Sequence, residues 1–461
     1  MKIDWTAELI AEQSCGTIIS KGNLPITGFS TDSRSIKPGN VYFALSGENF
    51  NGHQFIKSAF ENGAVGVVVS EDIDPVKSGF VIRVKDCLTA LQNCALFYRR
   101  QHQGFFIGVT GSNGKTTTRS MLAHLLSEDH ICASTTGNLN NHIGLPLTIL
   151  SVPAEAQFIV LEMGMNHAGE IRDLCRIAHP NAALVSNIGP AHIGILGSLE
   201  NIARAKAEIF EAMKPDSIKI APADTQFNEL FKMVAGKDLK TFGESESAEF
   251  RVKNIIPAID QVSFDFISMS ENCSCSLPMS GRHNALNAAA ALSLYQMLGF
   301  SAVKGARRLQ SFSAVSARME RVNRNGINIL LDCYNANPGS MKEALSYLNV
   351  CPRPCIAVLG DMRELGEMSA QLHREIGALA AELFPDVLLT VGEEAKHIAQ
   401  AASENKKQNF IISSVSTCDE AVPILKENLK PGATVLFKAS RGMHFEKIVR
   451  KIWPDLAEGL H

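Results

Sequence analysis

The feature that most constrains the fold is a glycine-rich turn between an apolar strand and a helix. The apolar run Phe105–Val109 leads into Gly111-Ser112-Asn113-Gly114-Lys115-Thr116-Thr117-Thr118, and a helix is expected from near Thr116 to Leu126. This order is typical of a phosphate-binding loop, in which backbone N–H groups and the helix N-terminus bind phosphate oxygens. The predicted ATP-binding residues are therefore Gly111, Ser112, Asn113, Gly114, Lys115, Thr116 and Thr117, with the Lys115 ammonium on the β- and γ-phosphates and the Thr116 hydroxyl on Mg²⁺.

The loop departs from the usual G-x-x-x-x-G-K-[ST] pattern in one place. That pattern has a glycine at position 109, where this chain has Val109, and Gly108 comes one residue too early. The alternative is a glycine turn that only connects a strand to a helix. The Gly-Lys-Thr core between a strand and a helix favours the phosphate loop.

Two other apolar runs end in residues that suit a nucleotide site. Phe158–Leu161 is followed by Glu162, and Ala182–Ser186 is followed by a loop that contains His192. Carboxyl ends of parallel strands lie at the sheet edge where ligands bind, so Glu162 is the expected acid for a metal ion and His192 is a second candidate. The alternatives are a strand-end glutamate in a surface ion pair and an ordinary loop histidine.

The pattern along the chain predicts an α/β protein of three domains. Short apolar runs in the middle region suit a parallel sheet, and the alternating run Val262–Phe266 suggests a local antiparallel excursion. From residue 317 onward, strands and helices alternate as in a doubly wound, Rossmann-like domain. The expected domains are residues 1–84, a small α/β domain; residues 85–316, a central P-loop domain; and residues 317–461.

Composition excludes several classes. The 461 residues are 45% hydrophobic and 20% charged, which is inconsistent with a largely disordered chain. A net charge of −3 argues against a general nucleic-acid binder. The sequence shows neither a signal peptide nor a run of about 20 apolar residues, and its eleven cysteines lack zinc-site spacing. A cytoplasmic protein without membrane insertion is expected.

Several motifs together resemble the Mur ligase family. They are Thr31-Asp32-Ser33-Arg34, the phosphate loop, Gly137-Asn138-Leu139-Asn140-Asn141, Glu162-Met163-Gly164-Met165-Asn166-His167, Ala205-Lys206-Ala207-Glu208, Gly281-Arg282-His283-Asn284, Asp332-Cys333-Tyr334-Asn335-Ala336-Asn337-Pro338, Gly360-Asp361-Met362-Arg363-Glu364-Leu365-Gly366 and Lys438-Ala439-Ser440-Arg441. The resemblance implies an ATP-dependent amide ligase of peptidoglycan precursor synthesis. It implies that D-alanyl-D-alanine is joined to UDP-N-acetylmuramoyl-tripeptide through an acyl phosphate.

The resemblance also implies roles for individual residues. Catalysis would involve Lys115, Glu162, His192 and Lys206, and Thr116, Glu162, His192 and carbamylated Lys206 would hold two Mg²⁺ ions. From the pattern alone, Lys206 looks like a solvated surface lysine. Asn284, Arg318 and Asp332 would contact ATP, although Asn284 could instead cap a helix and Asp332 could simply end a strand. The expected substrate-binding residues are Ser33, Arg34, Gly47, His53, Asn138, Asn140, Asn335, Asn337 and Ser440.

Some points stay open at the level of sequence. The chain departs from the resembled pattern at Asn51, which is more often aspartate, and at Gly194, where related sequences commonly have a glutamate nearby. A monomer is expected. The alternatives in function are another carboxylate–amine ligase, such as a folylpolyglutamate synthase or a ligase that adds the third stem residue, and a P-loop switch that ligates nothing.

Overall fold

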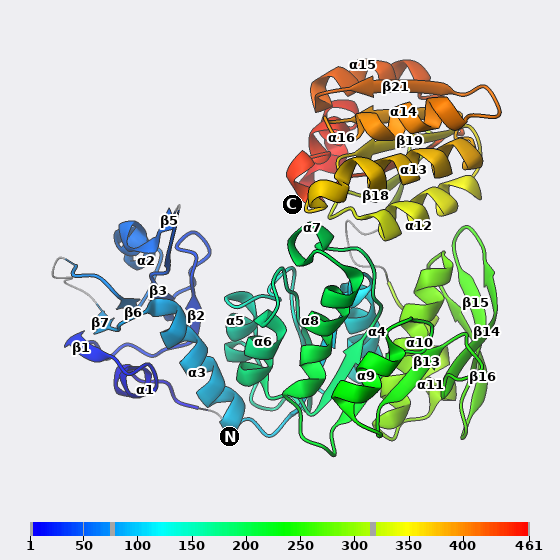
Figure 1. Ribbon diagram of the computed structural model, residues 1–461. Coiled ribbons are helices and arrows are strands. Elements are labelled where there is room, and N and C mark those ends of the chain that lie inside the picture. The colour runs from blue at the N-terminus through cyan, green and yellow to red at the C-terminus, as the bar shows by residue number, and fades with distance from the viewer. Residues whose placement is uncertain (1–2, 49, 74–78, 314–319, 460–461) are drawn as a thin grey trace.

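The computed structural model describes residues 3–48, 50–73, 79–313 and 320–459. Strands in these ranges form a five-stranded, a nine-stranded and a six-stranded sheet in chain order, with one two-stranded ribbon. Figure 1 shows three lobes, with the first and the third on different sides of the central one. The α/β class with a doubly wound last unit is confirmed. The exact cuts at residues 84 and 316 stay predictions, and residue 316 lies outside the described ranges.

The first lobe is built on a sheet in the order β1-β7-β6-β3-β2, in which only the β1–β7 pair is antiparallel. The apolar segments Val41–Phe43 and Val67–Val69 form the buried parts of strands β3 and β6. The elements are α1 (Ala7–Gln13), β1 (Thr17–Ser20), β2 (Gly28–Ser30), β3 (Asn40–Phe43), the ribbon β4 (Ser46–Gly47) and β5 (Phe50–Asn51), a 3-10 turn (Gly52–Phe55), α2 (Ile56–Glu61), β6 (Gly66–Val69) and β7 (Phe80–Arg83).

Helix α3 (Cys87–Gln101) connects the first lobe to the central one. The Asp86 side chain caps it by accepting a hydrogen bond from the backbone N–H of Thr89. Tyr98 on this helix donates a hydrogen bond to the carbonyl of Val152 in the central lobe. The helix is therefore anchored by one capped end and by packing against the central lobe.

The central sheet has the order β16-β15-β14-β13-β12-β11-β8-β10-β9. Strands β8 to β14 all run parallel to one another. The antiparallel excursion predicted at Val262–Phe266 is confirmed as β14–β15–β16 at one edge. The strands are β8 (Phe105–Thr110), β9 (Cys132–Ser134), β10 (Phe158–Glu162), β11 (Ala182–Val185), β12 (Ile218–Pro222), β13 (Lys240–Gly243), β14 (Phe250–Pro257), β15 (Val262–Ile267) and β16 (Asn272–Leu277).

Helices cover both faces of this sheet because successive strand residues point to opposite sides. Phe106 of β8 belongs to one apolar core, whereas Ile107 and Val109 belong to the other. Helices α4 (Lys115–Ser127), α10 (Arg282–Met297) and α11 (Ala302–Leu309) pack on the second core. The remaining central helices are α5 (Gly144–Leu150), α6 (Glu170–Ala178), α7 (Ile193–Leu196), α8 (Leu199–Glu211) and α9 (Asn228–Ala235).

The third lobe has the strand order β17-β18-β22-β19-β20-β21, parallel except for the edge strand β17. One core lies under α12 to α14 and another under α15 and α16, so the sheet is wound on both faces. The elements are β17 (Glu320–Arg324), β18 (Ile327–Asp332), α12 (Pro338–Asn349), β19 (Cys355–Gly360), α13 (Ser369–Leu383), β20 (Val387–Val391), α14 (Lys396–Asn405), β21 (Ile411–Val415), α15 (Cys418–Asn428), β22 (Thr434–Lys438), α16 (Glu446–Ile452) and short 3-10 turns at Gly366–Met368, Arg441–Met443 and Pro454–Gly459.

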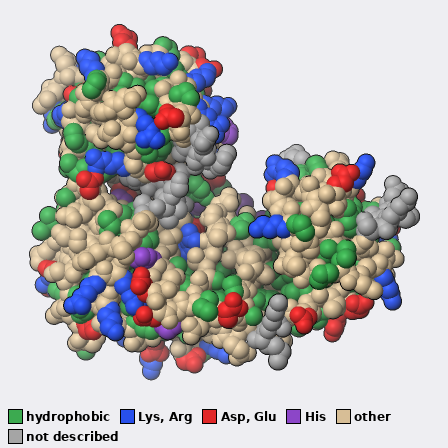
Figure 2. Space-filling view, turned by 180° about the vertical axis from the view of Figure 1, so that it is seen from behind, with side chains coloured by type: hydrophobic (Ala, Val, Ile, Leu, Met, Phe, Trp, Pro, Cys, Tyr) green, Lys and Arg blue, Asp and Glu red, His purple; other side chains and the backbone are tan. Residues whose placement is uncertain are grey.

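Among the described residues, no helix combines the length and apolar character that crossing a bilayer requires. All eleven cysteines are free thiols, and most are buried. Figure 2 shows the same three lobes from behind, with hollows where they meet. The parallel strands of the central and third lobes have their carboxyl ends at the hollow between these two lobes.

Candidate active site

The phosphate loop lies where the sequence places it, between β8 and α4. Gly114 precedes the first helical residue with φ +75°, and an added Cβ there would collide with the side chain of Asn287. Val109 is fully buried in β8 and pairs with strand β10, so the strand continues one residue further, to Thr110. The missing Walker glycine thus has a physical reason: position 109 belongs to the strand rather than to the loop.

The loop is held by the neighbouring strand end. The side chain of Asn187 accepts a hydrogen bond from the backbone N–H of Asn113 at 2.7 Å, and Ser186 Oγ donates to the Asn113 carbonyl at 2.6 Å. Lys115 Nζ donates to the carbonyl of Gly111 at 2.8 Å. These contacts fix the backbone before any ligand arrives, which suits a phosphate cradle.

Glu162 ends strand β10 beside the loop and is almost completely buried, with 2% of its side chain exposed. It accepts hydrogen bonds from Thr116 Oγ1 at 2.7 Å and from Asn140 Nδ2 at 2.8 Å, and Arg119 Nε lies 3.8 Å away. The alternative of a strand-end glutamate in a surface ion pair is wrong, because the carboxylate lies beneath the loop. Asn140 therefore orients the acid, while Asn138 lines the cleft nearby.

His192 occupies a left-handed conformation, φ +61°, at the start of α7. Its Nδ1 lies 2.6 Å from Oε2 of Glu364, which belongs to the third lobe, and this contact lowers the pKa of Glu364 below its ordinary value. In the tautomer in which Nδ1–H donates to Glu364, Nε2 carries the lone pair that a metal ion can bind. A histidine paired with a carboxylate in this way is the usual arrangement of a metal-ligating imidazole.

Lys206 lies on α8 with only 1% of its surface exposed, so the interpretation as a solvated surface lysine is wrong. Burial, together with the positive charge of Lys115, lowers the pKa of Lys206 well below its ordinary value. A lowered pKa increases the fraction of the amine that is neutral, and the neutral amine is the nucleophile that addition of CO₂ requires.

The residues expected at the other end of ATP come from both lobes. Asn284 does not cap its helix, because α10 begins at Arg282 with Gly281 as the capping residue, and the amide of Asn284 donates to the Ser280 carbonyl at 2.7 Å. Asp332 ends β18 and forms an ion pair with buried Lys438 at the end of the neighbouring strand β22. Both Asn284 and Asp332 face the cleft. Arg318 lies outside the described residues.

The third lobe contacts the phosphate loop directly. Asn337 caps α12, and its side-chain amide forms reciprocal hydrogen bonds with that of Asn113, at 2.6 and 3.3 Å. Ser440 Oγ accepts a hydrogen bond from the backbone N–H of Arg363 at 2.9 Å. Asn335 lines the cleft, and its carbonyl accepts from Lys438 Nζ at 3.3 Å. The Asn113–Asn337 pair joins the two lobes, and residues of both lobes line one cleft.

The cleft has a volume of about 1030 Å³. Of the predicted site residues, it is lined by Ser112, Asn113, Gly114, Lys115, Thr117, Asn138, Asn140, Glu162, His192, Asn284, Asp332, Asn335, Asn337 and Ser440. Thr116 and Lys206 are buried and do not line the cleft. The roles of individual residues stay predictions, but the structure gathers residues from 112 to 440 into one site.

The predicted residues of the first lobe lie apart from this cleft. His53 is held by the backbone N–H of Ser70, which donates to Nε2 at 3.0 Å, and by Asn51 Oδ1, 2.9 Å from Nδ1. Asn51 also donates from its amide to Glu71 at 3.0 Å, so an aspartate at position 51 would face a like charge. This contact gives the departure at Asn51 a physical reason. Ser33 is buried, Arg34 pairs with Asp32 at 2.7 Å, and Gly47 lies in the exposed ribbon.

Glu364, in the motif Gly360–Gly366, is a candidate that the sequence pattern does not reveal. The departure at Gly194 weakens the case for an acid in that loop, yet Glu364 from the third lobe supplies a carboxylate to His192. The N–H of Gly194 donates to the Glu364 carbonyl at 3.0 Å, and an added Cβ would collide with the backbone of Leu365 and Gly366. A glycine at 194 is therefore needed for the lobes to approach.

We expect Gly194→Ala to push the third lobe away from the central one. Because a small misplacement across a site is costly, ATP-dependent turnover should fall on the order of 10- to 100-fold. Small-angle scattering should show compaction on addition of ATP and substrates for the unaltered chain and less for this variant. Gly189→Ala is the control, since its added Cβ would meet nothing nearer than 3.8 Å. Equal scattering and turnover for the two variants would contradict the role of this contact.

The site suits a nucleotide-bound magnesium ion better than a protein-only metal centre. In the described ranges, no group of three or more His, Cys, Asp or Glu side chains is placed to hold a metal. Mg²⁺ is usually bound by one or two carboxylates together with substrate phosphates and water. The buried Glu162, the Thr116 hydroxyl and the oriented His192 fit that requirement beside a phosphate loop.

Comparison with known proteins gives consistent matches over the whole chain. Family models match in three ranges: "Mur ligase family, catalytic domain" over residues 25–97, "Mur ligase middle domain" over 109–295, and "Mur ligase, glutamate ligase domain" over 317–441. The UDP-N-acetylmuramoyl-tripeptide–D-alanyl-D-alanine ligase of Bacillus subtilis is 36% identical, covering 97% of this chain and 98% of the relative. The enzyme of the same name from Escherichia coli is 32% identical, covering 93% and 94%.

Solved structures agree with this result. MurF from Acinetobacter baumannii superposes with a TM-score of 0.89 at 31% identity, covering 98% of this chain and 99% of that one. The MurF ligase of Thermotoga maritima, in complex with ADP, gives 0.80 at 29% identity, covering 93% and 97%. A folylpolyglutamate synthase from Mycobacterium tuberculosis gives 0.61 at 16% identity, covering 79% of this chain and 93% of that one, which is a likeness of fold alone.

Proposed function

The chain belongs to the Mur ligase family, and from this membership we infer that it joins D-alanyl-D-alanine to UDP-N-acetylmuramoyl-tripeptide at the expense of ATP. The products are UDP-N-acetylmuramoyl-pentapeptide, ADP and phosphate. The protein is thus a ligase of peptidoglycan precursor synthesis. The observation that carries this inference is the single cleft, in which the phosphate loop faces the polar residues of the third lobe.

The reaction begins with attack of a terminal carboxylate oxygen of the tripeptide on the γ-phosphorus of ATP. The bond between this phosphorus and ADP breaks, and an acyl phosphate forms. The amine of D-alanyl-D-alanine then attacks the acyl carbon and loses a proton, and phosphate leaves with the C–O bonding electrons. Because two anions meet in the first step, neutralising charge is the main requirement of catalysis.

We assign that task to residues around the loop. Lys115, released from the Gly111 carbonyl, neutralises the β- and γ-phosphates. Thr116, Glu162 and His192, together with carbamylated Lys206, would hold Mg²⁺, for which we propose two ions; bound there, Mg²⁺ supplies positive charge to the phosphoryl oxygens. Glu364 orients the imidazole of His192, and Asn140 orients the carboxylate of Glu162.

The three lobes divide the substrates between them in this proposal. Residues 1–84 bind the uridine diphosphate end through Ser33, Arg34, Gly47 and His53. Residues 85–316 bind ATP, and residues 317–461 bind the incoming dipeptide through Asn335, Asn337 and Ser440. Asn284 contacts the adenine of ATP, and Arg318 and Asp332 contact its ribose and phosphates. Closure of the third lobe excludes water, which would otherwise hydrolyse the acyl phosphate.

We also propose that the protein works as a monomer in the cytoplasm. The cleft is completed by residues of one chain, so no second copy is needed to form the site. UDP-linked precursors are the substrates of the proposed reaction, and they belong to the cytoplasm. No nucleic acid is proposed as a partner, since the chain carries a net charge of −3.

The test is phosphate release from ATP in the presence of UDP-N-acetylmuramoyl-tripeptide, with and without D-alanyl-D-alanine. We expect turnover that depends on both substrates and formation of the pentapeptide by mass spectrometry. Turnover that requires glutamate or diaminopimelate instead would identify another ligase of the family. Slow hydrolysis that no acceptor accelerates would indicate a nucleotide switch and overturn the proposal.

A further inference from the structure

A second cavity lies at the opposite edge of the central sheet. It has a volume of about 240 Å³ and is lined by Arg99, Arg100, His179, Pro180, Asn181, Ala212, Lys214 and Ser217. Asn181 and Ser217 immediately precede strands β11 and β12, whereas the phosphate loop follows strand β8. Six residues of strand β8, about 20 Å at ~3.3 Å each, separate the two edges. The cavity is therefore distinct from the catalytic cleft.

The walls of this cavity carry positive charge without a matching acid. Three of the eight lining residues are Lys or Arg and none is Asp or Glu, although the whole chain has a net charge of −3. Among the described residues, no ion pair involves Arg99, Arg100 or Lys214. Glu211, which precedes Ala212 in the chain, is paired with Arg172 at 2.9 Å. The cavity wall thus carries positive side chains that form no ion pair with a carboxylate among the described residues.

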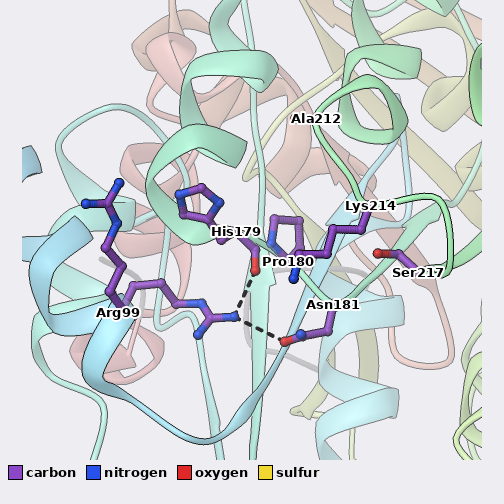
Figure 3. A pocket seen from close by; sticks show the side chains of 8 residues that line it. Arg99, His179, Pro180, Asn181, Ala212, Lys214 and Ser217 are labelled. Atoms are coloured by element: carbon purple, nitrogen blue, oxygen red, sulfur yellow. Dashed lines mark hydrogen bonds between the residues drawn. The ribbon is translucent and has the colours of Figure 1, made fainter.

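Arg99 builds the floor of the site. As Figure 3 shows, its guanidinium donates to the His179 carbonyl at 2.9 Å and to Asn181 Oδ1 at 3.2 Å. It also donates to the Ala178 carbonyl at 2.6 Å and lies 3.9 Å from the centre of the Phe106 ring. Because Asn181 Oδ1 also accepts from the Phe106 N–H at 2.9 Å, both of its lone pairs are used, and the amide nitrogen is the end of this side chain that can bind a ligand.

One ordinary explanation of basic residues here is that they balance helix C-termini. Three helices, α3, α6 and α8, end at the cavity, and each C-terminus contributes about −0.5 charge. Their sum of about −1.5 is smaller than the +3 of the lining side chains. Burial and the positive charges of Arg99, Arg100 and Lys214 together lower the pKa of His179, which is consistent with a net positive field. The excess charge is left for a ligand.

We propose that this cavity binds a small anion that carries a phosphoryl group. The Lys214 ammonium and the Arg100 guanidinium would neutralise it, and the Asn181 amide and Ser217 hydroxyl would donate to its oxygens. The volume is below the roughly 300–1000 Å³ of sites for drug-sized ligands, so the anion is small. Inorganic phosphate and a short phosphate ester share this chemistry.

The test uses the full chain with its ATP site filled by Mg²⁺ and a non-hydrolysable ATP analogue. Inorganic phosphate and glycerol 3-phosphate are the two probes, titrated by calorimetry. We expect Arg100→Gln combined with Lys214→Gln to weaken binding at least tenfold, with Arg99 retained because it holds the backbone. The control variant combines Lys237→Gln with Lys253→Gln and removes the same amount of positive charge from two exposed lysines that do not line the cavity. It should bind both probes as tightly as the unaltered chain does.

A second readout reports on the place of binding. When the anion is bound, the pKa of the His179 imidazole, followed by NMR, should rise, because a negative charge favours the imidazolium. Binding of phosphate alone would identify a free-phosphate site, and binding of both probes a site for phosphate esters; either result supports the proposal. Equal affinity in the two double variants, no binding of either probe, or an unchanged His179 pKa would overturn it.

Discussion

Replacing Lys115 by alanine is expected to lower the rate of ATP-dependent ligation on the order of 1000-fold. Lys115 begins α4 at the phosphate loop, and its ammonium lies against the loop carbonyls of Gly111 and Ser112. Transition-state charge on the γ-phosphoryl group would lose its nearest cation in a partly enclosed cleft, and removing one such donor costs about 100- to 1000-fold. The measurement is phosphate release with both substrates saturating.

The control separates catalysis from folding. The substitution Lys237→Ala, at an exposed residue distant in sequence from Lys115, should leave the rate of phosphate release unchanged. Thermal unfolding of Lys115→Ala should differ little from that of the unaltered protein, because Asn187 and Ser186 still hold the loop when the hydrogen bonds of Lys115 to the Gly111 and Ser112 carbonyls are lost. Retention of more than a tenth of the rate in Lys115→Ala would contradict the assignment.

Replacing Lys206 by methionine is expected to abolish most activity and yet to stabilise the fold. If Lys206 is carbamylated and holds a metal ion, its loss should lower turnover at least about 100-fold. Methionine fills a similar volume without burying a polar amine, so the midpoint of thermal unfolding at pH 7 should rise. Residues that serve function at a cost in stability behave in this way.

The dependence on pH has a definite sign. The folded-state pKa of Lys206 lies below the unfolded value, so between these values the unfolded chain binds more protons and the free energy of unfolding rises with pH. In buffer free of bicarbonate and metal, the unaltered chain should therefore gain stability relative to Lys206→Met as the pH rises toward 10. A parallel pH dependence of the two unfolding midpoints would contradict the lowered pKa of the buried amine.

Carbamylation itself is tested by bicarbonate. Protein prepared without CO₂ should have low turnover that bicarbonate restores, and Lys206→Met should not respond. Mass spectrometry under non-denaturing conditions should find one added CO₂ on the unaltered chain. Full activity of Lys206→Ala, without any response to bicarbonate, would exclude this role.

Local sequence was enough to predict the elements and the position of the nucleotide site. Strands β8 and β10 match the apolar runs Phe105–Val109 and Phe158–Leu161 to within one residue, and β15 covers the alternating run Val262–Phe266. The phosphate loop and Glu162 were recognisable because each depends on neighbours within a few positions of the chain. Residues at the ends of parallel strands share one edge of a sheet, so a sequence that shows the strands also shows which side chains meet.

The tertiary structure decided what long-range packing controls. From the pattern, Lys206 is a surface residue on an alanine-rich helix, but the fold buries it, and burial together with the positive charge of Lys115 lowers its pKa. Glu364 is 172 residues from His192, and only docking of the third lobe brings them within 2.6 Å. The cationic cavity likewise combines residues from 99 to 217. Sequence determines strands, turns and donor types because these depend on nearby residues, whereas burial, electrostatic environment and contacts between lobes arise only when distant segments pack together.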